Sequence, residues 1–401
     1  MAAEEVRQVV DDAAGYRAAL EALAAGAGPI AIDAERASGY RYSQRAYLIQ
    51  VFRRGGGSHL LDPPAIGRLD ELHRTFLDEE WVLHAATQDL PCLREVGIDP
   101  QRIFDTELAA RLLGMPRVGL GAVVEELLGI HLAKAHSAAD WSTRPLPQSW
   151  LDYAALDVEL LVDVRDQLAE RLEAAGKAEI AAEEFRSVLA RDLTPVRQEP
   201  WRRLSGLHTV RGARGLAVAR ELWLARDAYA QEVDTAPGRL VPDAALVAAV
   251  RAMPESKRAL AGLKEFNGRA SRSQLDRWWA AIERGRTTED LPAARAAGDA
   301  IPPHRSWPER NPEAAARLAA AKAAVTAAAE RLEIPLENLL TPDHLRRVAW
   351  EPPAPADAEH LAAALRALGA REWQIAATAQ LIADSFVEAA QASDEPAGAD
   401  S

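Results

Sequence analysis

Apolar positions in the first 190 residues change repeatedly between short runs typical of strands and longer stretches with helical spacing. The short runs, separated by breaks rich in glycine, predict strands at 29–35, 45–52, 58–62, 81–85 and 102–105, the first three as a meander. The helical spacing predicts helices that start near Gln88 and after Asp105, and others at 119–129 and 149–175. This order predicts an α/β domain with a mixed sheet and flanking helices.

Strand signals end near 192–195, and the rest of the chain has helical spacing, most clearly at 213–232 and 271–285. A stretch rich in proline, alanine and charge separates this first helical block from a second, and the last residues have the composition of a disordered tail. We therefore expect an α/β domain, an all-α domain, a linker, a second all-α domain and a tail at 1–195, 201–286, 287–311, 312–390 and 391–401.

The composition is that of a globular protein, with 48% hydrophobic and 27% charged residues in a chain of 401. Cys92 is the only cysteine, which excludes an internal disulfide and a zinc site built from cysteines. The sequence has no apolar run of the ~18 residues that a membrane helix needs, and its start lacks the features of a signal peptide. These observations predict a soluble, cytoplasmic protein.

Charge is distributed unevenly along the chain. The net charge is -13, which argues against a nucleic-acid partner because phosphate contacts need Lys and Arg. Residues 201–286, however, carry 16 Lys and Arg against 9 Asp and Glu, between two acidic flanks. A basic stretch of this kind indicates a nucleic-acid surface, although a solvated helical face with excess arginine has the same composition.

Asp33 and Glu35 are the first candidates for a site that binds metal. They lie two residues apart at the end of an apolar strand, so both side chains project from one face. Carboxylate pairs suit Mg²⁺ or Mn²⁺. The Asp-x-Glu pattern occurs five times in the chain, and a pair of surface carboxylates would have the same sequence.

Two later segments supply further candidates. Asp89 starts the helix after strand 81–85, where an acidic residue is also favoured by the helix dipole alone. Tyr153 and Asp157 lie at i and i+4 on a predicted helix, so the phenol and the carboxylate share a face. Each segment alone has an ordinary structural explanation. Together with Asp33 and Glu35 they supply the several carboxylates and the orienting group that two-metal phosphodiester cleavage needs.

The order of these motifs resembles the DEDD exonuclease superfamily. Ile32–Glu35, His84–Leu90 and Tyr153–Asp157 correspond to its three motifs. Tyr153 stands four residues before the last aspartate, and Asp152 occupies the position where another branch has histidine, so the tyrosine branch is indicated.

Blocks between these motifs narrow the resemblance to the ribonuclease D family. They are 105–114, 134–141 and 144–146, and the similarity covers roughly residues 6–190, with Ala34 where many members have threonine. The first helical domain is similar to HRDC domains at 201–206, 220–227 and 240–243, and the block 312–390 resembles a fainter second copy around 334–340. The resemblance implies a ribonuclease H-like sheet followed by two HRDC-like domains.

The resemblance also implies a function. Members of this family are 3′–5′ exoribonucleases, and the implied products are nucleoside 5′-monophosphates released from RNA, with tRNA precursors as the expected substrate. One of two divalent ions, Mg²⁺ or Mn²⁺, would lie among Asp33, Glu35 and Asp157, and the second would be held by Asp33 and, through water, by Asp89. Tyr153 would orient the attacking water. In the basic domain we expect RNA contacts from Arg269, Arg272 and Arg277.

Other functions remain open from the sequence. The same carboxylates would serve a 3′–5′ DNA exonuclease, since the choice of sugar depends on details of the pocket. A catalytically silent RNA-binding or scaffold protein with this fold is a second alternative. A zinc enzyme that uses His131 and His136 lacks a supporting ligand set, and we expect both in a surface loop. We expect no membrane association and a monomer.

Overall fold

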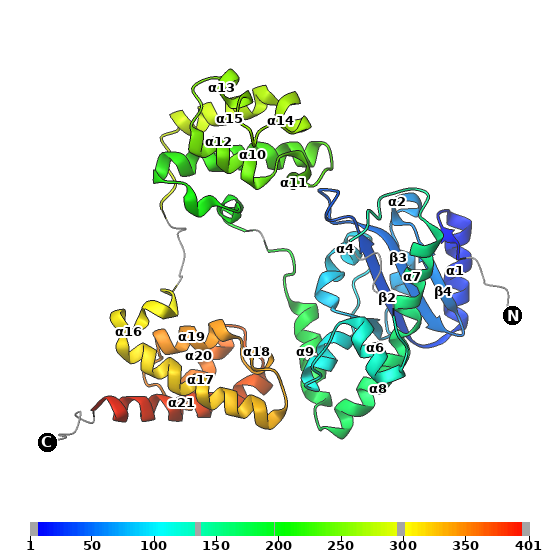
Figure 1. Cartoon of the computed structure of the whole chain (residues 1–401). Helices are drawn as coiled ribbons and strands as arrows, with labels where there is room; N and C mark the ends of the chain where they lie inside the picture. Colours follow the sequence, from blue (N-terminus) through cyan, green and yellow to red (C-terminus); the bar gives the residue numbers. More distant parts are fainter. Residues whose placement is uncertain (1–6, 133–137, 196, 295–300, 395–401) are drawn as a thin grey trace.

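The computed structural model describes residues 7–132, 138–195, 197–294 and 301–394. Figure 1 shows an α/β domain, which contains the sheet, and two separate groups of helices that follow it in the chain. Within the described residues, no helix has the length and apolar character needed to cross a membrane.

The α/β domain is built on a six-stranded mixed sheet with the order β1-β4-β3-β2-β5-β6. Its strands are β1 Val9–Val10, β2 Ala27–Arg36, β3 Ala46–Arg54, β4 Gly57–Leu61, β5 Trp81–Leu83 and β6 Ile103–Asp105. The meander is confirmed, because β3 pairs antiparallel with both β2 and β4, while β5 pairs parallel with β2 and with β6. The two-residue strand β1, parallel to β4, was not predicted, because it is too short for a periodic pattern.

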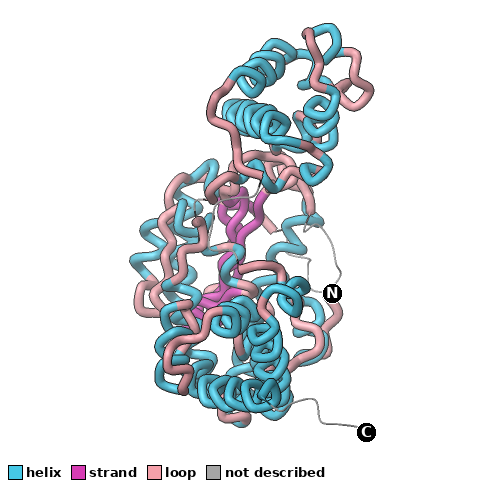
Figure 2. The backbone as a smooth tube through the Cα atoms, turned by 90° about the vertical axis from the view of Figure 1, so that its left-hand side faces the viewer, coloured by secondary structure: helices cyan, strands magenta, loops and turns pink. Residues whose placement is uncertain are grey.

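Helices cover both faces of this sheet, and Figure 2 shows strands running between them. They are α1 Ala13–Ala25, α2 Pro63–Ile66, α3 Asp70–Thr75, α4 Leu90–Glu95, α5 Thr106–Leu112, α6 Leu120–Leu128, α7 Gln148–Glu159, α8 Leu161–Ala174 and α9 Ala178–Ala190. On β3, Leu48 faces a small apolar cluster with α7, whereas Ile49 and Val51 face the main core, which includes α1. The single helix predicted at 149–175 is two, α7 and α8, which meet at Leu160.

The first helical domain has a hydrophobic core of its own, centred on Leu222, Phe266 and Trp278. Its helices are α10 Gly212–Glu232, α11 Pro237–Leu240, α12 Asp243–Ala252, α13 Lys257–Ala261, α14 Arg269–Ser273 and α15 Leu275–Thr287. The helix predicted at 271–285 is divided at Gln274 into α14 and α15.

The C-terminal helical domain begins before the predicted boundary. Helix α16, Trp307–Arg310, lies inside the predicted linker, and Trp307 is fully buried against Trp350. The other helices are α17 Pro312–Leu332, α18 Leu336–Leu339, α19 Pro342–Trp350, α20 Ala358–Ala367 and α21 Glu372–Asp394. Since α21 continues to Asp394, the first residues of the predicted tail are helical.

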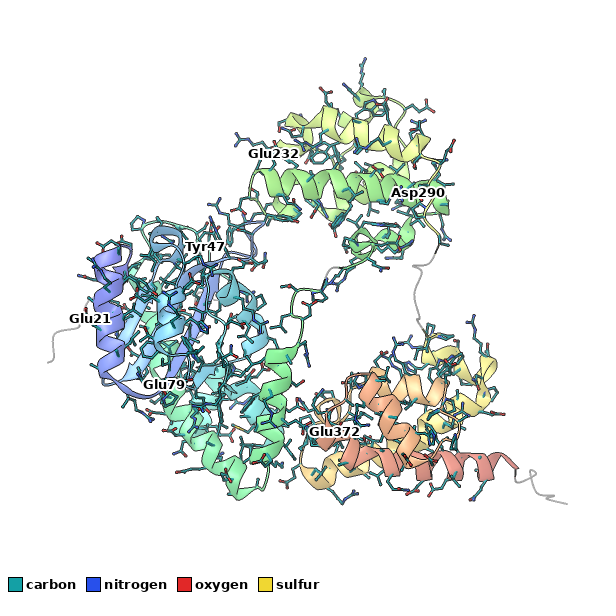
Figure 3. All side chains as sticks on the ribbon, turned by 180° about the vertical axis from the view of Figure 1, so that it is seen from behind. Glu21, Tyr47, Glu79, Glu232, Asp290 and Glu372 are labelled. Carbon is teal, nitrogen blue, oxygen red and sulfur yellow. The ribbon has the colours of Figure 1, made fainter. Side chains whose placement is uncertain are left out.

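The two helical domains contact the α/β domain differently. The C-terminal domain and the α/β domain share one main hydrophobic core. Between these two domains, Arg371 donates a hydrogen bond to Glu184 at 2.5 Å. The first helical domain instead meets the loop between β2 and β3, near Tyr47 and Glu232 in Figure 3. In that contact Ser43 donates its backbone N–H to Asp234 at 2.9 Å.

Candidate active site

Strand β2 places two carboxylates on the face of the sheet that α7 covers. Asp33 lies opposite Gln50 of β3, and Glu35 lies opposite Leu48. Leu48 packs with Ala154 of α7 in one apolar cluster, and directly opposed side chains of paired strands share a face. Both carboxylates therefore point from the central strand toward the same helix, and their role as metal ligands stays a prediction.

Helix α7 brings the third carboxylate to this pair. Asp157 is buried, and its ligand oxygen lies within 4.8 Å of ligand oxygens from Asp33 and Glu35. The Tyr153 hydroxyl, one helical turn earlier, donates a hydrogen bond to Asp157. The i, i+4 spacing thus delivers the phenol and the carboxylate together, as the sequence predicts.

Asp89 completes the set from a turn after β5. It stands between a 3₁₀ turn, Ala86–Gln88, and α4, and its side chain is buried and hydrogen-bonded to that of Asp33. Arg36 forms an ion pair with the Asp89 carboxylate at 3.7 Å. Asp89 is the N-cap residue of α4 but makes no side-chain cap hydrogen bond to it, and its carboxylate is hydrogen-bonded to Asp33 instead.

A buried aspartate, Asp105, accepts hydrogen bonds from the turn that precedes Asp89. Asp105 caps α5, the helix predicted to start after it, by accepting the backbone N–H groups of Glu107 and Leu108. It also accepts the backbone N–H of Ala85 at 3.1 Å and of Ala86 at 2.9 Å. Ala85 has a left-handed backbone with φ of 59°, a conformation that costs a residue with a side chain some free energy. Asp105 is thus a positioning residue for Asp89, and a helix-cap pattern carries no sign of this second contact.

Burial raises the pKa of every carboxylate in the cluster, and neighbouring charges add to this for all but Asp33. Burial, reinforced by the charges of Asp33, Asp157 and Asp89, raises the pKa of Glu35 to about 9. Burial and the charge of Asp33 raise the pKa of Asp157 to about 7. Burial also raises the pKa of Asp33 and, together with the charge of Asp33, that of Asp89. The pKa of Tyr153 is raised by burial and by Asp157, so its hydroxyl stays protonated at neutral pH.

These residues fit divalent cations of the Mg²⁺ type. The donor set consists only of carboxylate oxygens, three of which converge, and hard cations prefer such ligands. A bound cation would also stabilise the ionised carboxylates, which burial and mutual repulsion disfavour. Beside Glu35 and Arg36 lies a pocket of about 310 Å³, which reaches Gly39 and Ala138.

The other predicted site residues lie away from this cluster. Arg269 and Arg272 belong to α14 of the first helical domain. Arg277, on α15, forms an ion pair with Glu232 at 2.7 Å and stacks on Tyr229, so its charge is partly neutralised. His131 is highly exposed and lies 3.6 Å from Glu125, and His136 lies outside the described residues.

Comparisons with known proteins show which families this chain resembles. A 3′-5′ exonuclease family model matches residues 7–173, and an HRDC domain model matches 215–282. Ribonuclease D of Granulibacter bethesdensis is 34% identical over 289 residues, which is 69% of this chain and 69% of the relative. The chain belongs to the ribonuclease D family. Ribonuclease D of Escherichia coli is 32% identical over 234 residues, or 57% of this chain and 61% of that protein.

Solved structures extend the similarity to all three domains. The crystal structure of a protein from Bifidobacterium adolescentis has a TM-score of 0.88 and 36% identity, and covers 96% of this chain and 98% of that one. Escherichia coli RNase D, described as an exoribonuclease involved in structured RNA processing, has a TM-score of 0.68 and 27% identity, covering 90% and 99%. The predicted fold, an exonuclease sheet domain followed by an HRDC region, is confirmed.

Membership of the ribonuclease D family and the 3′–5′ exonuclease domain make this chain a hydrolytic exoribonuclease. The alternative of a silent scaffold is thereby set aside. For residues 300–386 the matching model is a 3′ to 5′ exonuclease C-terminal domain, and the second HRDC copy stays a prediction.

Proposed function

We propose that this ribonuclease D family member removes nucleoside 5′-monophosphates from the 3′ end of RNA by hydrolysis assisted by two divalent cations. The observation that carries the proposal is the convergence of Asp33, Glu35 and Asp157 within 4.8 Å, beside a protonated Tyr153. When bound, Mg²⁺ or Mn²⁺ would activate a water as nucleophile and stabilise charge on the leaving 3′ oxygen.

Each side chain then has a separate task. Asp33, Glu35 and Asp157 would hold one cation, and Asp33 and Asp89 the second, since Asp33 contacts both groups. Tyr153 would orient the attacking water through its hydroxyl. A raised pKa makes the phenol a poor general base and a stable hydrogen-bond donor at neutral pH.

In this proposal the HRDC domain would also contact the RNA. Gly39, at the edge of the pocket beside Glu35, accepts a hydrogen bond from Arg239 of α11 at 2.6 Å. Helix α11 packs against α14, which carries Arg269 and Arg272. We propose that these two arginines contact the phosphate backbone, with Arg277 contributing less because Glu232 pairs with it.

Charge reversal tests this surface. Arg269→Glu with Arg272→Glu should weaken RNA binding and reduce the slope of log affinity against log salt by roughly 1 per lost phosphate contact. Fluorescence anisotropy over a salt series measures both. Arg310→Glu, an exposed change in the C-terminal domain, is the control. An unchanged salt slope would remove α14 from the RNA path.

We propose that the substrate is an RNA with a 3′ extension and that tRNA precursors are the natural case. We also propose that the enzyme acts in the cytoplasm as a monomer. The test compares the unmodified chain with Asp33→Ala on a 3′-extended tRNA and on matched single-stranded DNA, with Mg²⁺, Mn²⁺ or EDTA. Asp78→Ala, which alters another Asp-x-Glu sequence in an exposed position, is the matched control. Metal-dependent trimming of the RNA, lost only in Asp33→Ala, is expected.

Two other outcomes would change the proposal. Faster trimming of the DNA would make the chain a DNA exonuclease in practice. RNA binding without metal-dependent cleavage of either strand would contradict the catalytic proposal altogether.

A further inference from the structure

Gln50 is a buried polar residue that the proposed mechanism does not use. It lies in β3, and its side chain is fully buried. Neither its amide nitrogen nor its amide oxygen has a hydrogen-bond partner among the described residues. A buried amide without a partner is destabilising, because it has lost its hydrogen bonds to water. An apolar residue would pack at this position without that cost, so the presence of glutamine needs an explanation.

The register of the sheet places Gln50 beside the metal ligands. It is the direct cross-strand partner of Asp33, and on its other side it pairs with Leu60 of β4. Leu48 and Leu60 both pack against α7, so this face of β3 is the one that looks toward Asp157. Opposed residues of antiparallel strands have Cβ atoms about 5 Å apart, a separation that a glutamine side chain can span to reach a carboxylate.

Asp33 has room for another donor. Its carboxylate hydrogen-bonds the Ala34 backbone and Asp89, whereas a carboxylate offers about four acceptor positions. Asp33 is also the ligand that the proposed function assigns to both cations, so its orientation matters more than that of any other group. Ligating carboxylates generally need hydrogen-bond donors behind them to fix their orientation.

We propose that Gln50 is a positioning residue for the metal site, and that its amide NH₂ donates to Asp33 when this carboxylate turns to bind divalent cations. The inference rests on the proposed function, because it takes Asp33 as a metal ligand. It adds a residue from a second strand to the site. The unpaired Gln50 amide is then a hydrogen-bond donor that Asp33 uses once cations are bound.

Gln50→Met tests the proposal, because methionine has nearly the shape of glutamine and no amide. Unfolding of the full chain in EDTA and binding of Mn²⁺ without RNA, by isothermal titration calorimetry, are the two readouts. Binding of Mn²⁺ should weaken roughly tenfold or more, while the midpoint of unfolding in EDTA stays equal or rises. Leu48→Met, on the same face of β3 and two residues away, is the matched control and should leave Mn²⁺ binding unchanged.

Affinity for Mn²⁺ decides the question. If folded Gln50→Met binds Mn²⁺ as the unmodified chain does, the inference is wrong, whatever happens to stability. Should this variant not fold, Gln50→Leu replaces it with the same criterion. If the unmodified chain trims RNA but Gln50→Met binds Mn²⁺ as tightly as the unmodified chain does, this inference is overturned and the proposed function stands. Weaker Mn²⁺ binding in Gln50→Met, in a chain that trims no RNA, would support the inference and overturn the proposed function.

Discussion

At the scale of single residues, the site brings several carboxylates together in a largely buried position. Asp89 and Asp157 are buried, and the charges of Asp33, Asp89 and Asp157 all contribute to the raised pKa of Glu35. Burial without a compensating cation disfavours the ionised form of each group. The clustered carboxylates therefore lower the stability of the fold locally and attract cations strongly, a combination that is common in active sites.

This arrangement predicts a pH dependence of stability that cations reverse. The pKa of Glu35 is about 9 in the folded chain against 4.5 for an ordinary glutamate. Between these values the folded state binds more protons than the unfolded state, so the free energy of unfolding should fall as pH rises. Urea unfolding in EDTA at about pH 6 and about pH 8 measures the fall, and saturating Mn²⁺ should reduce it, because cation binding releases the protons.

Glu35→Gln is the control for that experiment, since it removes the titrating group and keeps the shape. Its stability in EDTA should fall less over the same range. The same fall in both proteins would show that Glu35 is not its source.

At the scale of elements, the sequence predicted what local periodicity determines. A period of two places Asp33 and Glu35 on one face of β2, and a spacing of four places Tyr153 and Asp157 on one face of α7. The break at Leu160 and the short strand β1 had no such signal. Contacts made across the fold were also beyond prediction, because nothing near Asp105 in the sequence indicates that Ala85 will lie beside it.

Asp105 joins two elements, and its replacement should disturb both. In Asp105→Asn, one acceptor oxygen becomes an NH₂ group, so either the Ala86 N–H or the three N–H groups that share the other oxygen lose their acceptor. We expect a loss of about 1–3 kcal/mol in the free energy of unfolding and weaker metal-dependent activity through a displaced Asp89. Urea unfolding and RNA trimming over an Mg²⁺ series measure the two effects.

Asp12→Asn is the matched control, because Asp12 caps α1 through a single contact to Gly15 and lies at an exposed position. Asparagine is as good a cap, so stability and the Mg²⁺ response should not change. Equal effects in the two variants would reduce Asp105 to an ordinary helix cap.

At the scale of the whole molecule, the two helical domains are attached by different kinds of contact. The HRDC domain holds the β2–β3 loop through polar groups: Tyr42 donates to Asp227 at 3.1 Å, and Arg239 stacks on Tyr40. Its hydrophobic core is separate from the rest. The C-terminal domain instead continues the core of the exonuclease domain and adds an ion pair between Arg371 and the buried Glu184.

This difference predicts two calorimetric transitions, one for the HRDC domain and one for the exonuclease and C-terminal domains together. Leu222 of α10 and Leu365 of α20 are both fully buried, and Leu→Ala at such positions costs about 2–5 kcal/mol. Leu222→Ala should lower the midpoint of the HRDC transition alone. Leu365→Ala should lower the other, although it lies in the C-terminal domain, because a shared core unfolds as one cooperative unit. A third transition that only Leu365→Ala shifts would show that the C-terminal domain unfolds independently, despite its continuous core.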